Sequence, residues 1–328
     1  MFDALPDELA AIVLASVPWR DRLRCAAVCR SWERVLRGAH MWDDMLRSKS
    51  PVAHLRWMCT TGDLGTAQLI AEQFKITVED IRAGEILRAC PSCPKFMRWL
   101  AMTFELTAED ILVGNFLWGA CTGGHLGFAQ WLATTFNLTA EDARTQNVLY
   151  TTCANGHFEL ARWLVTTFKL TADDVPTSVL YVTCGGRHLE IAQWLTTTFE
   201  LSAESDRPGY GHILVSAYAH DFIEVAAWLI ATFGLTLDDF RGPHGDYLRL
   251  IGNLARSSTI EWIVRRHDIS GWEDRSALVQ GAARRSSSLE AVRHLHSVLG
   301  FTAEEQHLAK HYSSGATLEW LNATFGAS

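Results

Sequence analysis

The sequence predicts an all-α chain, in which a short three-helix module at the N-terminus is followed by an α-solenoid of about nine helix pairs. Three observations predict this architecture. A tryptophan-centred string returns at intervals of 26 to 34 residues, a glycine ends the first apolar stretch in three central repeats, and residues 1–46 do not follow the repeat. A period of this length is typical of stacked repeats, because one repeat alone cannot bury its apolar face.

The repeat is anchored on the tryptophan of the string A-x-W-L. Nine related repeats run from about His54 to Phe325, with the anchor position at Leu69, Trp99, Trp131, Trp163, Trp194, Trp228, Trp262, His294 and Trp320. Burial of a tryptophan or leucine side chain contributes about 1.5–3 kcal/mol. The anchors are therefore expected to supply much of the cohesion between repeats.

Each central repeat contains two apolar stretches. The first ends at a glycine, such as Gly124 or Gly156, where a helix can stop because glycine readily adopts a left-handed backbone. The second carries apolar residues at helical spacing, supplemented by Trp163: Phe158, Ala161, Leu164 and Phe168. Two antiparallel helices in each repeat follow from this pattern.

A second phrase, of the form LTAED, lies between the repeats. Its threonine is followed three residues later by an acidic residue, which is typical of a helix start. Thr139 is expected to accept a hydrogen bond from the amide of Asp142. We predict a short extra helical turn in each connector and no β-hairpin, with a break before Pro176.

The string at Leu149–Val165, LYTTCANGHFELARWLV, resembles the ankyrin repeat. Leu149 matches the leading leucine, Gly156 and His157 match the Gly-His turn, and residues 163–165 match the leucine triplet. The connector departs from that pattern, since the turn and hairpin that join ankyrin repeats are missing. The resemblance implies a helical groove for protein binding without the hairpin fingers.

The N-terminal module reads as three short helices. Pro6 suits a first helical position, Pro18 ends the first helix and Gly38 ends the third. A segment of about 45 residues is near the lower limit for an independent core. Its apolar residues exceed what three short helices can bury among themselves, so the surplus needs the solenoid or a partner.

This module resembles an F-box, although Met41 replaces the usual leucine before the last tryptophan and Arg22 precedes Leu23. The residues that carry the resemblance, and that it assigns to adaptor binding, are Leu5, Pro6, Leu9, Ile12, Leu14, Leu23, Val28, Cys29, Trp32 and Trp42. We therefore assign residues 1–46 to the F-box-like module, 47–53 to a short linker and 54–328 to the ankyrin-like solenoid.

The F-box resemblance implies docking onto a Skp-type adaptor and, through it, a cullin–RING ubiquitin ligase. The solenoid would then hold an unknown target protein. An alternative remains open, in which the N-terminal helices close the stack of an interaction scaffold that has no link to ubiquitination. The combination is similar to F-box/ankyrin families of giant amoebal DNA viruses, in which case the adaptor belongs to the host cell.

Composition limits the other partners. The net charge is −8, whereas nucleic acid would require a concentrated basic face. No apolar run approaches the roughly 18 residues of a membrane span, and acidic residues occupy the start of the chain where a secretory signal is basic. We expect an intracellular protein, cytoplasmic or nuclear, that binds neither nucleic acid nor membrane.

No constellation of catalytic or metal-binding residues emerges. Cys90 and Cys93 form a CxxC pair, but a zinc site needs four ligands and a second pair is missing. The other cysteines of the repeats occupy one recurring slot for a small buried residue: Cys59, Cys121, Cys153 and Cys184. The histidines four residues after the last three match the Gly-His turn. We expect no metal, no cofactor and no enzymatic activity.

One column of residues is a candidate for target binding. Trp118, Tyr150 and Tyr181 stand thirteen residues before the anchor in three consecutive repeats. Aromatic residues often anchor interfaces. A competing interpretation is that this slot, like the matching ankyrin histidine, is buried between repeats. The acidic excess of the solenoid favours a target with basic segments.

Overall fold

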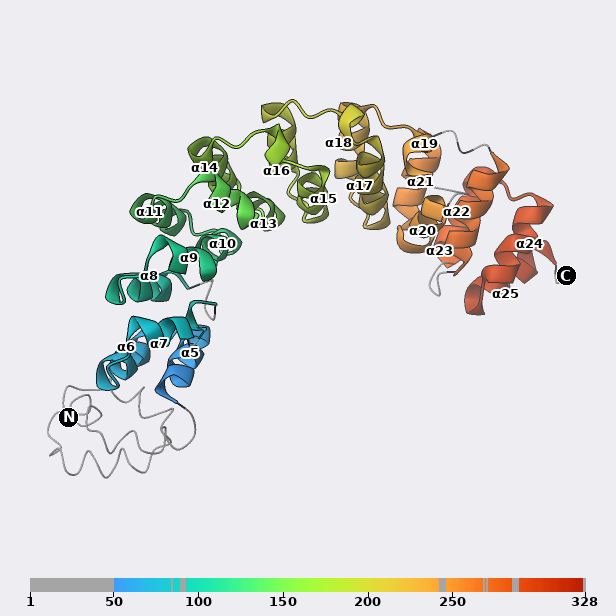
Figure 1. Cartoon of the computed structure of the whole chain (residues 1–328). Coiled ribbons are helices and arrows are strands. Elements are labelled where there is room, and N and C mark those ends of the chain that lie inside the picture. Colours follow the sequence, from blue (N-terminus) through green and yellow to red (C-terminus); the bar gives the residue numbers. More distant parts are fainter. Residues whose placement is uncertain are drawn as a thin grey trace, which may run out of the picture. The chain divides into compact units, whose positions relative to one another are not determined.

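The computed structural model describes residues 50–83, 85–88, 93–241, 246–267, 269, 271–284 and 289–326. Every regular element in these ranges is a helix, which confirms an all-α fold for the described part of the chain (Figure 1). The module predicted at residues 1–46 lies outside the described residues. The ten predicted adaptor-binding residues lie there too.

Two helices occupy each period, and the anchor position falls on the second. The pairs are α5 (Pro51–Thr61) with α6 (Leu64–Gln73), η3 (Ile86–Arg88) with α8 (Pro94–Thr103), α10 (Phe116–Thr122) with α11 (Leu126–Phe136), α13 (Val148–Ala154) with α14 (Phe158–Phe168), α15 (Thr177–Gly185) with α16 (Leu189–Thr198), α17 (Arg207–Ala219) with α18 (Ile223–Phe233), α20 (Asp246–Leu254) with α21 (Ser257–Arg266), α22 (Trp272–Arg284) with α23 (Leu289–Leu299), and α24 (Ala303–Tyr312) with α25 (Gly315–Phe325). Helix α5 begins at Pro51, inside the segment assigned to the linker, and Ser50 caps it.

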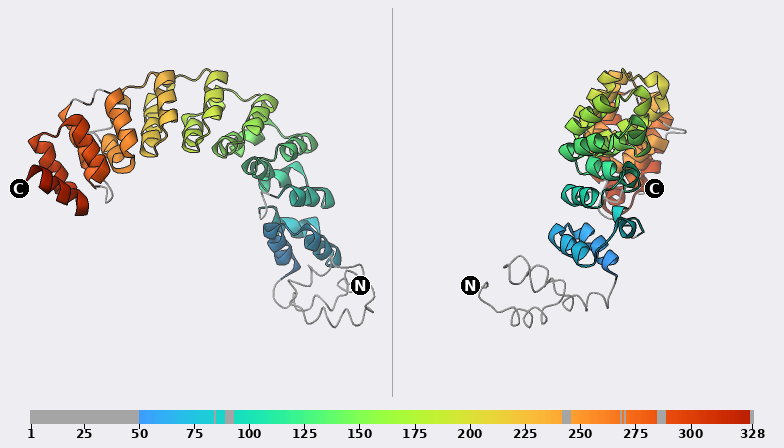
Figure 2. Two further views of the ribbon diagram at one scale, coloured as in Figure 1. Left: turned by 180° about the vertical axis from the view of Figure 1, so that it is seen from behind. Right: turned by 60° about the vertical axis from the view of Figure 1, so that its left-hand side comes forward.

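The chain divides into two compact parts. Among the described residues, unit 1 comprises 50–152 and 159–169, and unit 2 comprises 153–158 and 170–326. In unit 2 the first helices pack on one another in the order α15, α17, α20, α22, α24, while the second helices α21, α23 and α25 pack in their own row. Figures 1 and 2 show these two layers within unit 2.

Six connectors fold as short helices, whereas Thr302 caps α24 directly and no separate helical turn precedes it in the described residues. The six short helices are α7 (Val78–Ala83), α9 (Ala108–Val113), α12 (Ala140–Thr145), η4 (Ala172–Asp174), η5 (Ala203–Ser205) and α19 (Leu237–Phe240). The Asp142 amide donates to Thr139 Oγ1 at 3.3 Å and the Thr139 amide donates to Asp142 Oδ2 at 2.7 Å, so the predicted cap is present. Helix η4 ends before Pro176, and α15 starts after it, as the sequence predicts.

The core includes a column of aliphatic residues beside the anchor tryptophans. All seven anchor tryptophans are half-buried. The residue after the anchor is instead fully buried in every repeat: Ile70, Leu100, Leu132, Leu164, Leu195, Leu229, Ile263, Leu295 and Leu321. Five of the seven tryptophans make an edge-to-face contact with the phenylalanine five residues on, as Trp131 does with Phe136 at a centroid distance of 5.7 Å. The aliphatic column therefore contributes to the core beside the partly buried tryptophans.

The glycine turns have the predicted backbone. Gly124 and Gly156 adopt φ values of 67° and 76°, which a residue with a Cβ reaches only with strain. In unit 2 the His188 ring fills the space above Gly156, so a Cβ there would overlap it. This histidine therefore packs between repeats, in agreement with its assignment to a structural turn.

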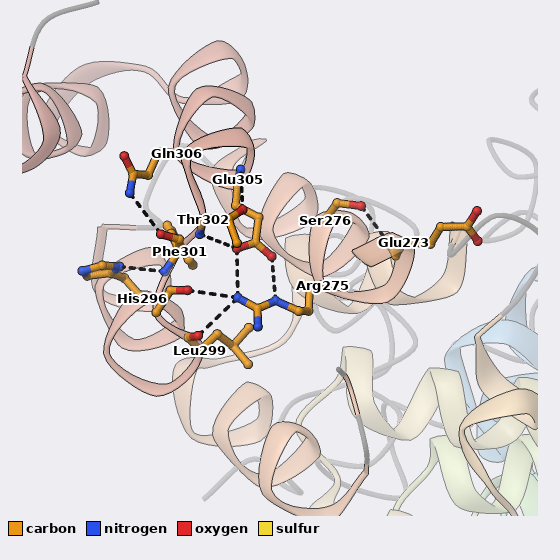
Figure 3. A network of polar contacts seen from close by, with 10 residues as sticks. Glu273, Arg275, Ser276, His296, Leu299, Phe301, Thr302, Glu305 and Gln306 are labelled. Carbon is orange, nitrogen blue, oxygen red and sulfur yellow. Dashed lines mark hydrogen bonds and ion pairs between the residues drawn. The ribbon is translucent and has the colours of Figure 1, made fainter. Parts of the chain in front are cut away.

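A row of arginines links several neighbouring repeats, and the repeat pattern of the sequence did not predict it. Arg82 Nε donates to Asp110 Oδ1 at 2.8 Å, and Arg82 Nη2 donates to Asp110 Oδ2 at 2.8 Å. The Arg82 guanidinium holds the pKa of Asp110 well below its usual range. The same bidentate contact joins Arg275 to Glu305 in unit 2 (Figure 3). Bidentate pairs fix orientation as well as distance, so they set the register between repeats.

Candidate functional site

The predicted aromatic column lies on the first helices and is exposed. Trp118 on α10 and Tyr150 on α13, both in unit 1, keep 37% and 39% of their surface, and Tyr181 on α15 in unit 2 keeps 47%. The competing interpretation, burial between repeats, is wrong for these three residues. Exposed Trp and Tyr side chains lose little conformational entropy on binding, which suits them to anchor an interface.

Neighbouring positions of the same helices explain this exposure. The residue before each aromatic and the residue three after it are buried, as Leu180 and Cys184 are around Tyr181. Thr183 is also buried, and its hydroxyl donates to the Val179 carbonyl oxygen. Because the buried hydroxyl is satisfied within the helix, the inward face needs no outside partner. The aromatic side chain is left on the outward face.

Charge is absent from the first helices of these three repeats. The segments of α10, α13 and α15 read FLWGACT, VLYTTCA and TSVLYVTCG, without an acidic or basic residue. Interface centres are depleted of charged residues and enriched in Trp and Tyr. The outward face of these helices thus has the composition of an interface centre.

A gap and a groove accompany the helices, one in each unit. In unit 2 a narrow gap without room for a water molecule is lined by Tyr181, Cys184, Gly185, Ile213, Ser216, Ala217 and Phe222. In unit 1 a groove of about 380 Å³ lies between α11 and α14 and is lined by Gln130, Ala133, Thr134, Leu138, Trp163, Thr167 and Phe168. Neither lining includes a carboxylate, histidine, lysine or arginine.

The cysteines are placed as structural residues. Cys59, Cys121, Cys153 and Cys184 are buried. Burial raises the pKa of the Cys121 thiol and of the Cys184 thiol to about 12, so both remain protonated near neutral pH. Cys93 is half-buried, while Cys90 lies outside the described residues. Within the described ranges, no group of three or more His, Cys, Asp or Glu residues could hold a metal ion.

The described part of the chain is an all-helical array with an exposed aromatic face. A family model described as F-box-like matches residues 2–48. The chain thus carries an F-box-like domain at its N-terminus, and F-box domains generally bind Skp1-type adaptors. The match includes all ten residues that the sequence assigns to adaptor binding.

The remaining comparisons add no relative. Neither the curated proteins nor the solved structures compared with this chain include a match. In the part that the structure describes, no helix combines the length and the apolar character needed to cross a bilayer.

Proposed function

We propose that the chain is the substrate-recognition subunit of a Skp–cullin–F-box type ubiquitin ligase. The F-box-like domain docks a Skp-type adaptor through the residues of the F-box pattern, with Leu5 and Pro6 leading the contact. The repeats hold a target protein on the outward face of their first helices. The observation that carries this proposal is the F-box-like match joined to an array whose exposed aromatic face is free of charge.

The array is an ankyrin-like α-solenoid with helical connectors in place of hairpins. The alternation of first and second helices supports this assignment, as does the packing of His188 over Gly156 at the turn between them. Recognition by the first helices is consistent with the exposure of Trp118, Tyr150 and Tyr181.

The chain itself performs no chemistry in this mechanism. Binding of both the adaptor and the target brings a target lysine close to the ubiquitin-loaded subunits of the ligase. Such tethering raises the effective concentration of the two reactants by orders of magnitude without a new catalytic group. A subunit of such a ligase acts in the cytoplasm or nucleus, which would be that of the host cell if the chain is viral.

Co-purification with a Skp-type adaptor tests the proposal. The full-length chain should retain the adaptor, and Leu5→Ala/Pro6→Ala should reduce recovery at least tenfold. Tyr181→Ala is the matched control, since this exposed residue lies on α15 and should leave adaptor recovery unchanged. Equal recovery by wild type and the Leu5/Pro6 variant refutes the ligase role and leaves the scaffold alternative.

A further inference from the structure

The negative charge of the chain is concentrated in one segment. Residues 170–240 contain Arg187 and Arg207 as their only basic residues against ten acidic ones: Asp173, Asp174, Glu190, Glu200, Glu204, Asp206, Asp221, Glu224, Asp238 and Asp239. The segment therefore carries the equivalent of the whole net charge of −8. All of it belongs to unit 2.

Some of these carboxylates have structural partners and others do not. Asp239 pairs with Arg207, and Asp221 accepts hydrogen bonds from the Arg256 amide at 2.6 Å and from Thr259 Oγ1 at 2.7 Å. In contrast, a second set is exposed and forms no ion pair with any residue that the structure describes: Glu190, Glu200, Glu204 and Glu224. We call these four residues the free carboxylates.

A face with three exposed large apolar side chains and two polar ones lies among them on the first helices of unit 2. Helices α15, α17 and α20 contact one another in this order and lie side by side in Figure 1. Their outward positions carry Tyr181, exposed at 47%, and Leu250 and Leu254, each exposed at 43%. Between them α17 presents His212 and Ser216, which lie four residues apart and therefore on one side of the helix. We call these five residues the α15–α17–α20 face.

The free carboxylates flank both ends of this face. Glu204 belongs to η5, which directly precedes the N-terminal end of α17. Glu190 and Glu224 are the second residues of α16 and α18, which follow the C-terminal ends of α15 and α17. A helix of thirteen residues such as α17 is about 20 Å long. Carboxylates thus stand beyond both ends of α17, while the charged residues of α20, Asp246 and Arg249, pair with each other at 3.1 Å.

We propose that the α15–α17–α20 face binds a target segment that has apolar side chains at its centre and Arg or Lys residues on both flanks. This inference rests on the proposed function and names the chemistry of the target. The apolar centre covers Tyr181, Leu250 and Leu254, while the basic flanks neutralise the free carboxylates. Complementary charge at the rim of an interface accelerates association and excludes partners of the wrong sign. Acidic segments and anionic lipid surfaces are therefore excluded from this face.

A display library of random 16-residue peptides, selected on the immobilised full-length chain, provides the probe. Enriched peptides should carry a net positive charge with basic residues on both sides of an apolar centre. They should bind at least tenfold more weakly to Tyr181→Ala/Leu250→Ala. Enrichment of neutral or acidic peptides overturns the proposal, and so does a selection that yields no binder.

Carboxylate removal at matched positions gives the decisive comparison. Glu190→Gln/Glu204→Gln/Glu224→Gln should weaken the selected peptides about tenfold at low ionic strength, and 0.5 M salt should abolish the difference. The control, Glu79→Gln/Glu105→Gln/Glu109→Gln, removes three exposed carboxylates from unit 1, where Glu109 holds the repeat position that Glu204 holds in unit 2. It should change the affinity less than twofold. Equal effects of the two triple variants refute the proposal.

Adaptor recovery with the same two triple variants separates this inference from the proposed function. Unchanged adaptor recovery together with unchanged peptide affinity refutes the target chemistry alone. Peptide binding that depends on the free carboxylates, in a chain that recovers no adaptor, refutes the ligase role and leaves the binding face in place.

Discussion

Two helical glycines of unit 2 should respond to alanine with opposite signs. Gly281 lies in α22, where a Cβ would overlap the carbonyl oxygen of Arg249 in α20 and come within 3.0 Å of the Asn253 amide nitrogen. Gly185 is the last residue of α15, and a Cβ there meets nothing within 4 Å. Both residues lack a positive φ, so an alanine is compatible with either backbone.

The magnitudes follow from two competing terms. Alanine in place of a helical glycine stabilises a protein by about 0.4–1 kcal/mol, because the unfolded chain loses freedom. At Gly281 the overlap is with backbone, which no rotamer change relieves, so α20 and α22 must separate. Overpacking of this kind costs about 1–3 kcal/mol or more, and separation also loosens Leu248 and Leu278, which are fully buried. We expect Gly281→Ala to destabilise by about 2 kcal/mol and Gly185→Ala to stabilise by about 0.5 kcal/mol.

Urea unfolding of the full-length chain, followed by circular dichroism at 222 nm, measures both changes. Hydrogen exchange of peptides from α20 and α22 locates the effect, because repeats interact mainly with their neighbours. Gly281→Ala should speed exchange there and leave α5 and α6 unchanged. If Gly281→Ala is as stable as wild type, the close approach of α20 and α22 is refuted. The same holds if Gly185→Ala destabilises the chain as much as Gly281→Ala does.

Three further predictions concern ion pairs, pH and thiols. Arg275→Met should destabilise the chain by about 3 kcal/mol, because it leaves the fully buried Glu305 carboxylate without its partner. Arg82→Met should cost about 1 kcal/mol, because the Arg82 side chain is 45% exposed. Equal falls in the urea midpoints of the two variants would contradict this ranking. Burial, and then Arg266, lower the pKa of His267 from 6.5 to about 4, so stability is full above pH 6.5 and falls as pH drops toward 4. The loss is about 1–2 kcal/mol after allowance for partial exposure, and His267→Phe should lose less stability over that range than wild type. Native alkylation at pH 8, mapped by mass spectrometry, should modify Cys93 and spare Cys121 and Cys184; rapid labelling of the latter two would contradict their burial.

Local features of this fold were predictable from the sequence, because each depends on residues a few positions apart. The cap formed by Thr139 and Asp142 involves only a three-residue span, and the left-handed turn at Gly156 is a property of one residue. Both features follow from propensity and hydrogen bonding within one turn. The first and second helices of each repeat follow in the same way.

Contacts between repeats were harder to predict, because they depend on the stacking register. Arg82 and Asp110 are separated by 28 residues, and no local rule pairs them. A signal does exist in the sequence: Arg82, Arg207 and Arg241, the last of which pairs with Asp274, stand five residues after the threonine or serine that starts their own connector. A leucine, Leu112, holds this position in the second repeat.

The anchor tryptophans show a different limit of sequence reasoning. Periodicity identified the recurring position, but adjacent residues of a helix point about 100° apart. When Leu164 is at the centre of the buried stripe, Trp163 must lie at its edge, where it remains half-buried. The same geometry places Tyr181 beyond the edge of the stripe formed by Leu180 and Cys184. The exposure of each aromatic side chain therefore depends on which of two adjacent helix positions faces the core.

This division of positions allows recognition to be tested without loss of the fold. Cohesion between repeats comes from the fully buried aliphatic column and the arginine row, whereas the α15–α17–α20 face contributes exposed side chains. Substitution of exposed residues usually changes stability by less than about 0.5 kcal/mol, so Tyr181→Ala should leave the urea midpoint of the chain near that of wild type. A loss of target binding in that variant would then report on contact with the target. A large fall in its midpoint would show instead that Tyr181 helps to hold α15 against α17, and the assignment of this face to recognition would fail.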